Sequence, residues 1–173
     1  MPFLEQMTAY CRKSGFSISQ ADEKSMSLRF DMESGRTQTI YIMDFDGSIE
    51  FSVPSALILE REGDLPHAIS TDLLRKSRMN KIGMWVIEEI GGKFAYSLMY
   101  NVPMPSLAPD FFHTIIETMI LQCEEFDAAL ASATGQTISS SYGGEFGKGV
   151  ARGVGHKVGM LAAGTLLSLL LDN

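Results

Sequence analysis

The chain has 173 residues, which fits a single domain, and its 45% hydrophobic and 20% charged residues argue against disorder over most of its length. Residues 1–141 carry 11 Lys or Arg against 19 Asp or Glu, a net charge of −8, whereas residues 142–173 carry a net charge of +1. A body this acidic repels phosphate backbones, and no basic run offsets it, so nucleic acid is excluded as an expected partner.

The first residues predict a short amphipathic helix over 2–14, followed by Gly15 as a stop signal. Its apolar positions are Phe3, Leu4, Met7, Ala9, Tyr10 and Cys11. The two cysteines, Cys11 and Cys123, each fall in an expected helix, which favours buried free thiols over a disulfide or a redox role. The start has an early acid and no apolar h-region, so no secretory signal is expected and the cytoplasm is the expected location.

From Phe16 onward the apolar residues alternate with a period of two, which predicts strands with one buried face. The alternating positions are Phe16, Ile18, Met26, Leu28, Phe30, Ile40, Ile42, Ile49, Phe51 and Val53. Turn residues at 22–24, 33–35 and 44–47 separate these strands and predict three hairpins. Pro54 and the loop 60–64 are expected to end the meander, because a proline cannot donate into a central ladder.

A middle helix is expected to begin at a cap formed by Ser70 or Thr71 and to run to about Met79. Its inward-facing residues are expected to be Leu73 and Leu74. Two further strands follow, over 82–87 and 94–100, and Gly91-Gly92 between them gives the strongest hairpin signal in the chain.

Pro109 suits the first turn of a last, long helix. Its apolar stripe is expected to consist of Phe112, Ile115, Ile116, Met119, Cys123, Phe126 and Leu130. The opposite, polar side is expected to consist of Glu117, Glu124, Glu125 and Asp127. One face of this helix therefore packs on the sheet.

The element order is α-β-β-β-β-α-β-β-α, which predicts an α+β fold, with an antiparallel sheet and the helices packed to one side. A ferredoxin-like arrangement would need a helix between the first two strands, where the sequence shows none. Residues 1–131 form the expected domain, 132–149 a Gly/Ser-rich linker, and 150–173 a hydrophobic tail, expected to be helical.

Residues 1–131 resemble the bacterial YbjN-like family, whose fold is similar to that of type III secretion chaperones. The stretches that carry the resemblance are 27–30 (SLRF), 38–42 (QTIYI), 48–53 (SIEFSV), 80–85 (NKIGMW) and 97–103 (SLMYNVP). The resemblance implies a fold and, by analogy with the chaperones, a homodimer that holds part of another polypeptide. It supplies no residue with an assigned role, and it does not cover the tail.

Three patterns that could carry chemistry each have a simpler interpretation. Residues 44–47 (DFDG) have the acid spacing of part of a calcium loop, but they lie between alternating strands, which favours a hairpin turn. His113 and Glu117 stand one helical turn apart without a further ligand, which favours an exposed helix pair. Residues 143–149 fail the phosphate-loop pattern in spacing and in the final Ser/Thr. We therefore expect no catalytic, cofactor-binding or metal-binding residues, and no enzyme.

Methionine is abundant, with 11 residues, and flexible thioethers suit a surface that adapts to varied apolar partners. Core filling is favoured for Met84, Met99 and Met119, whereas Met79 and Met104 are candidate partner contacts. Trp85 is a third candidate, as an interface anchor. The alternative for Trp85, burial under the final helix, stays open.

The tail holds an uncharged run over 158–171, and four-residue spacing places the basic residues before it on one helix face. As a helix the run would span roughly 21 Å, short of the roughly 30 Å hydrocarbon core of a membrane. Three interpretations stay open: insertion at a membrane surface, self-association, and docking on the body or on a partner. The candidate tail contacts are Lys148, Arg152, Val158, Leu161, Leu166 and Leu170.

The sequence thus favours a non-enzymatic protein-binding module, chaperone-like or regulatory, that acts as a homodimer on a protein or peptide partner. The alternative is a peripheral membrane accessory protein, targeted by its tail to the inner face of the membrane.

Overall fold

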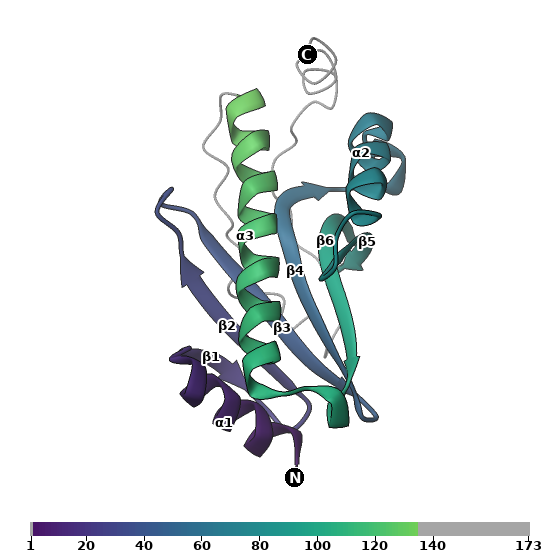
Figure 1. The fold of residues 1–173 in the computed structure, drawn as a ribbon. Coiled ribbons are helices and arrows are strands. Elements are labelled where there is room, and N and C mark those ends of the chain that lie inside the picture. Colours follow the sequence, from purple (N-terminus) through teal and green to yellow (C-terminus); the bar gives the residue numbers. More distant parts are fainter. Residues whose placement is uncertain (1, 135–173) are drawn as a thin grey trace.

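The fold is α+β, with one antiparallel sheet and three helices packed against it, as the sequence predicts. The computed structural model describes residues 2–134; residue 1 and residues 135–173 lie outside the described residues. The strand order is β1-β2-β3-β4-β6-β5 (Figure 1). The elements are α1 (Phe3–Ser14), β1 (Ile18–Ala21), β2 (Ser25–Asp31), β3 (Thr37–Phe45), β4 (Ser48–Leu59), η1 (Glu62–Asp64), α2 (His67–Ser77), β5 (Met84–Ile90), β6 (Lys93–Pro103), η2 (Met104–Ser106) and α3 (Pro109–Thr134).

Two tight hairpins depend on left-handed backbone at both turn residues, which two-residue turns of this kind require. Asp46 and Gly47 join β3 to β4 with φ of 52° and 92°, and Gly91 and Gly92 join β5 to β6 with φ of 60° and 79°. Asp44 Oδ1 also accepts the Gly47 N–H at 2.8 Å. The hairpin interpretation of residues 44–47 is therefore confirmed.

Pro54 does not end the meander, contrary to the sequence-based expectation. It lies inside β4, opposite Ser97 of β6, and the register between these strands shifts between Pro54 and Ile58. β3 pairs with β4 only as far as Ser52, so Pro54 lies beyond the part of β4 that has neighbours on both sides. A proline is tolerated at such an edge or bulge because no ladder bond there needs its N–H.

The middle helix begins earlier than expected and faces the sheet differently. α2 starts at His67 after Pro66, so neither Ser70 nor Thr71 caps it. The Ser70 hydroxyl instead lies 2.6 Å from the Tyr96 hydroxyl of β6. Leu73 is buried but Leu74 is 67% exposed, so the inward placement of Leu74 was wrong.

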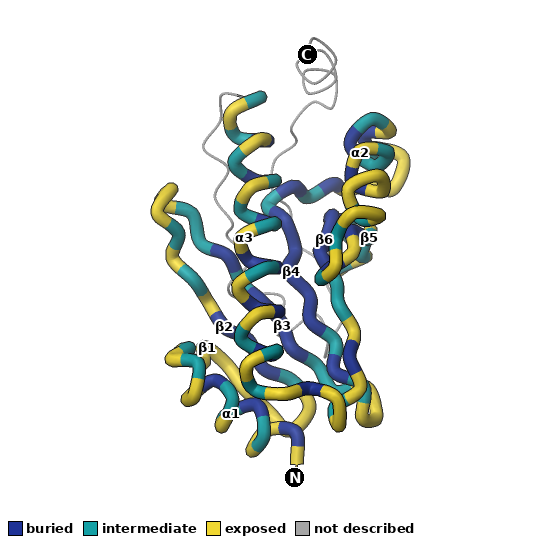
Figure 2. The backbone as a smooth tube through the Cα atoms, in the orientation of Figure 1, coloured by how far each residue is buried: buried dark blue, intermediate teal, exposed yellow. Residues whose placement is uncertain are grey.

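α3 lies across one face of the sheet, and its buried side faces the strands (Figure 2). The buried residues of the stripe are Phe112, Ile115, Ile116, Met119, Cys123 and Leu130, as predicted, and Phe126 is half-buried. Asp127 was expected on the polar side but is fully buried. α3 runs through Thr134, three residues into the segment expected as a linker.

Both cysteines are buried free thiols, as expected. Cys11 Sγ lies 3.6 Å from Met26 Sδ, and Cys123 Sγ lies 3.8 Å from the Val53 carbonyl oxygen. Burial raises the pKa of Cys11 to about 11 and raises the pKa of Cys123 well above its ordinary value. Both thiols therefore stay protonated near neutral pH, and protonated thiols are poor nucleophiles.

Candidate functional site

The three helices all contact the same face of the sheet. Side chains alternate across a strand, and each helix contacts residues of the same face. Cys11 of α1 contacts Met26, Ser70 of α2 contacts Tyr96, and Phe112 of α3 packs edge-to-face against Phe51. The opposite face, here called the open face because none of the three helices contacts it, consists of Ser27, Tyr41, Met43, Glu50, Ser52, Pro54, Met84, Val86, Glu88, Ala95, Ser97, Met99 and Asn101. Its serines, Tyr41, Pro54 and Ala95 are buried, whereas Met84 and Asn101 are exposed and the remaining residues are half-buried.

Three methionines lie on the open face in two neighbouring rows of paired residues. Met84 pairs with Met99, while Met43 pairs with Glu50 in the next row. Met84 is 57% exposed, and Met43 and Met99 are half-buried. The core placement predicted for Met84 and Met99 was therefore wrong, and the one for Met119 is confirmed.

The reason lies in β5, where apolar residues occur in both alternating phases and the pattern alone does not fix which side faces the core. The larger Trp85 takes the buried side, 6% exposed, with its ring centroid 4.9 Å from that of Phe126 in α3. Burial of the larger aromatic surface contributes more to stability than burial of a methionine. Met84 and Val86 consequently point to the open face.

Two carboxylates lie beside the methionines. The Ser52 hydroxyl donates to Glu88 Oε2 at 2.9 Å, and this bond runs from β4 to β5 over Ser97 of the intervening strand. Among the described residues the buried Ser97 hydroxyl finds no hydrogen-bond partner. Burial and the charge of Glu88 raise the pKa of Glu50, against a hydrogen bond from Asn101. The open face thus carries a pair of methionines, Met84 and Met99, a further methionine on β3 and an acidic pair.

A buried polar network fixes α3 to the other face of the sheet. The two Asp127 carboxylate oxygens accept hydrogen bonds at 2.9 Å, one from Gln38 Nε2 of β3 and one from the Ala56 N–H of β4. Arg36 donates to Glu124, the carboxylate one turn before Asp127. Burial raises the pKa of Asp127 to about 6, although its hydrogen bonds lower it.

The pKa of the neighbouring Glu124 carboxylate shifts in the opposite direction. Burial raises its pKa, but hydrogen bonds from Arg36, Ser34 and Gln38 outweigh this effect and leave the pKa below its ordinary value. Glu124 is thus charged near neutral pH and supplies the counter-ion of Arg36. The sequence signal for this network was the spacing of Asp127, four residues after the buried Cys123 and within the apolar stripe.

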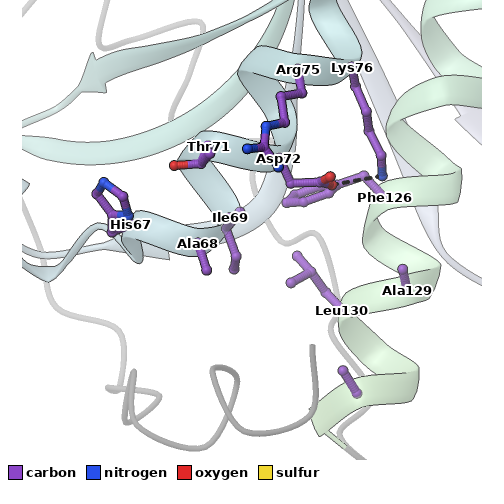
Figure 3. A pocket seen from close by; sticks show the side chains of 11 residues that line it. His67, Ala68, Ile69, Thr71, Asp72, Arg75, Lys76, Phe126, Ala129 and Leu130 are labelled. Carbon is purple, nitrogen blue, oxygen red and sulfur yellow. Dashed lines mark ion pairs between the residues drawn. The ribbon is translucent and has the colours of Figure 1, made fainter. Parts of the chain in front are cut away.

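A groove of about 430 Å³, here called the α2/α3 groove, lies between α2 and the last turns of α3 (Figure 3). Its apolar lining consists of Ala68, Ile69, Phe126, Ala129, Leu130 and Ala133. Its polar lining comes from α2 and consists of His67, Thr71, Asp72, Arg75 and Lys76. Asp72 pairs with Lys76 at 3.1 Å. The groove volume lies within the usual range for a ligand or peptide-anchor site.

The three body residues suggested by the sequence as partner contacts lie in different places. Trp85 is buried under α3, which is the alternative that the sequence left open. Met79 follows α2 and is 71% exposed, whereas Met104 in η2 is half-buried against the core. These three residues do not form one surface on the described chain, and only Met79 offers a largely exposed side chain.

The candidate ionisable pair on α3 has an ordinary structural setting. His113 Nε2 lies 3.2 Å from Glu117 Oε2, and the His113 ring stacks on Phe16 at a centroid distance of 5.0 Å. Within residues 2–134, no three His, Cys, Asp or Glu side chains gather closely enough to hold a metal ion. The exposed helix pair is therefore confirmed for these two residues.

The candidate tail contacts lie outside the described residues. They are Lys148, Arg152, Val158, Leu161, Leu166 and Leu170. Among the helices that are described, none is long and apolar enough to cross a membrane.

A scan against protein-family models finds no match to this chain, and a search of curated proteins finds no match either. The resemblance to the YbjN-like family consequently stays a prediction carried by the strand and turn segments of residues 1–131.

Proposed function

We propose that this chain is a non-enzymatic protein-binding module, chaperone-like or regulatory, that holds apolar segments of a partner polypeptide on its open face. The observation that carries the proposal is the grouping of Met43, Met84 and Met99 on one face of the sheet, at the surface or half-buried. Unbranched, polarisable thioethers repack against apolar partners of different shapes, which suits a surface that binds more than one segment.

The charge beside the methionines favours one class of partner segment. Glu50 and Glu88 lie on the same face as these methionines, and residues 1–141 carry a net charge of −8. Complementary charges speed encounter and fix the register of a bound segment. The preferred segment is therefore apolar with flanking lysine or arginine residues.

Fluorescence anisotropy with a labelled, unstructured peptide tests this proposal. The probe is an apolar peptide flanked by lysines, and its partner probe carries glutamates in place of the lysines. The full chain is expected to bind the lysine probe at least about tenfold more tightly. Equal affinity for both probes, or binding of neither, would contradict the proposal.

A matched pair of variants locates the binding surface. Met84→Lys places a charge on the open face, and Leu121→Lys places the same charge on the exposed side of α3, where Leu121 is 61% exposed against 57% for Met84. We expect Met84→Lys to weaken binding of the lysine probe at least about tenfold and Leu121→Lys to change it less than about twofold. Met79→Lys tests the other exposed methionine in the same assay. If only Met79→Lys weakens binding, the peptide binds beside the end of α2 and not on the open face.

The homodimer is the second part of the proposal and is supported by the resemblance to chaperones. Light scattering of the full chain should then give twice the mass of 19.0 kDa. A monomeric mass at micromolar concentration would contradict the dimer. If Met84→Lys converts the dimer to a monomer, the open face binds a second copy of the chain instead of a partner peptide.

A further inference from the structure

The α2/α3 groove lies beside the end of the described chain, and we propose that it is the docking site for the apolar segment 158–171 of the same chain. The groove is formed by helices that cover one face of the sheet, and the open face lies on the other. The inference is therefore independent of the proposed function. It selects docking on the body from the three interpretations of the tail.

The groove has the lining that an apolar helix needs. Phe126, Leu130 and Ile69 contribute large apolar side chains to the lining (Figure 3), and Ala129 and Ala133 of α3 contribute small ones. Small residues on one wall let another backbone approach closely, and apolar anchors then fill the space between the helices. The groove therefore fits an amphipathic or apolar helix better than a polar ligand.

The rim of the groove carries the positive charge of Arg75, with which an acidic residue beside the segment could pair. Asp72 pairs with Lys76, but among the described residues no acidic side chain pairs with Arg75. The segment 158–171 is uncharged and is followed directly by Asp172. Docked with its C-terminal end toward Arg75, the segment would bring Asp172 to an arginine that has no acidic partner among the described residues.

The segment has the composition and spacing of a groove ligand. It contains six leucines, at 161, 166, 167, 169, 170 and 171. In a helix, Leu166 and Leu170 lie on the same face one turn apart, which is the spacing by which apolar helices anchor in grooves.

The intervening chain is long enough to bring the segment to the groove. Ala133 lines the groove, and residues 134–157 separate it from Val158. A flexible chain of this length would span roughly 25–30 Å on average, which is enough to return to the helix that precedes it. Linkage of this kind gives effective concentrations near the millimolar range, so even weak docking is well populated.

Hydrogen exchange of the full chain tests the docking. Ala129→Glu places a charge in the groove at an exposed position, and Leu166→Asp with Leu170→Asp removes the anchors from the segment. Both are expected to speed exchange of the α2 amides, residues 67–77, by at least about tenfold, because a docked helix protects the elements that it covers. Ala9→Glu, at an exposed alanine of α1, serves as the control and should leave α2 unchanged.

Tryptophan fluorescence gives a second readout that does not depend on hydrogen exchange. Trp85, the single tryptophan, contacts Phe126 in the groove wall, so its fluorescence should shift equally in both groove and segment variants. Unchanged α2 exchange in both variants would overturn the proposal. Protection that grows with protein concentration would show docking into a second copy and would overturn the intramolecular assignment. Flotation of the full chain with anionic vesicles, equal in Ala129→Glu and the unmodified chain, would assign the segment to lipid.

Discussion

The Asp127 carboxylate of α3 accepts the backbone N–H of Ala56 at 2.9 Å, at the bulge where β4 changes its register against β6. The bulge leaves this N–H without a ladder partner, and an unpaired buried N–H is costly. A single side chain of the last helix therefore stabilises the bend in β4 and, through Gln38, holds β3 beside it.

Removal of the Asp127 carboxylate should destabilise the protein. Asp127→Ala leaves Ala56 N–H and Gln38 without their acceptor, and the expected loss in the free energy of unfolding is about 2–4 kcal/mol at pH 5. Glu125→Ala, two residues earlier at an exposed position, is the control and should change stability by less than about 0.5 kcal/mol. Urea unfolding measures both, and equal losses would show that the network contributes nothing specific.

The pKa of Asp127 predicts an unusual pH dependence. Its value in the folded chain, about 6, lies above the ordinary value of 3.8, so the folded state binds this proton more tightly. The stabilisation that comes from this tighter proton binding is fully present below about pH 4 and is lost as the pH rises through 6. Asp127→Asn has no such titration. The stability of the unmodified chain relative to Asp127→Asn should therefore fall by about 2–3 kcal/mol between pH 4 and pH 7. A constant difference across this range would contradict the raised pKa.

The ion pair of Arg36 and Glu124 should matter more than an exposed pair. Both side chains are 14% exposed, whereas those of Lys24 and Asp46, 3.7 Å apart, are 72% and 98% exposed. We expect Arg36→Met to cost about 1–3 kcal/mol, because it leaves a half-buried carboxylate without its partner. Lys24→Met should cost less than about 0.5 kcal/mol. Denaturant unfolding of both variants checks the contrast, and losses of the same size would refute it.

Gly83 should be less replaceable than a glycine with the same backbone conformation in open space. Gly83 and Gly35 have φ of 83° and 80°, but a Cβ at Gly83 would lie 2.8 Å from Leu98 Cγ, while nothing lies within 4 Å at Gly35. Gly35→Ala should cost about 1 kcal/mol for the backbone, and Gly83→Ala about 1–3 kcal/mol more for the clash. Thermal unfolding that ranks the two variants equally would show that Leu98 moves aside freely.

The sequence predicted the element order and, except for the methionines of β5 and β6, the helix-covered face, because these depend on local patterns. Periodicity located α1, α3 and the strands, and left-handed turn residues such as Gly91 located the hairpins. Pro54 was misplaced because the tolerance of a strand for proline depends on which neighbouring strand is present at that position. A local residue pattern does not show which strands, distant in sequence, pair with each other.

The site was harder to predict than the fold for the same reason. Met84 and Trp85 are adjacent apolar residues in β5, and which of them is buried depends on packing against α3, where Trp85 contacts Phe126. Asp127 was assigned to the polar side by its charge, although its spacing placed it in the apolar stripe. Its buried partners come from 71 and 89 residues earlier in the chain, so no local pattern could name them.

The central claim, that the open face binds apolar segments of a partner, is tested most directly by NMR of the methionine methyl groups in the full chain. The lysine-flanked peptide is added, and the signals of the 11 methionines are followed. The methyl signals of Met84, Met99 and Met43 should shift or broaden, while those of the core residue Met7 and of Met79, which follows α2, should not. Shifts confined to Met79, or no shift at saturating peptide, would contradict the account.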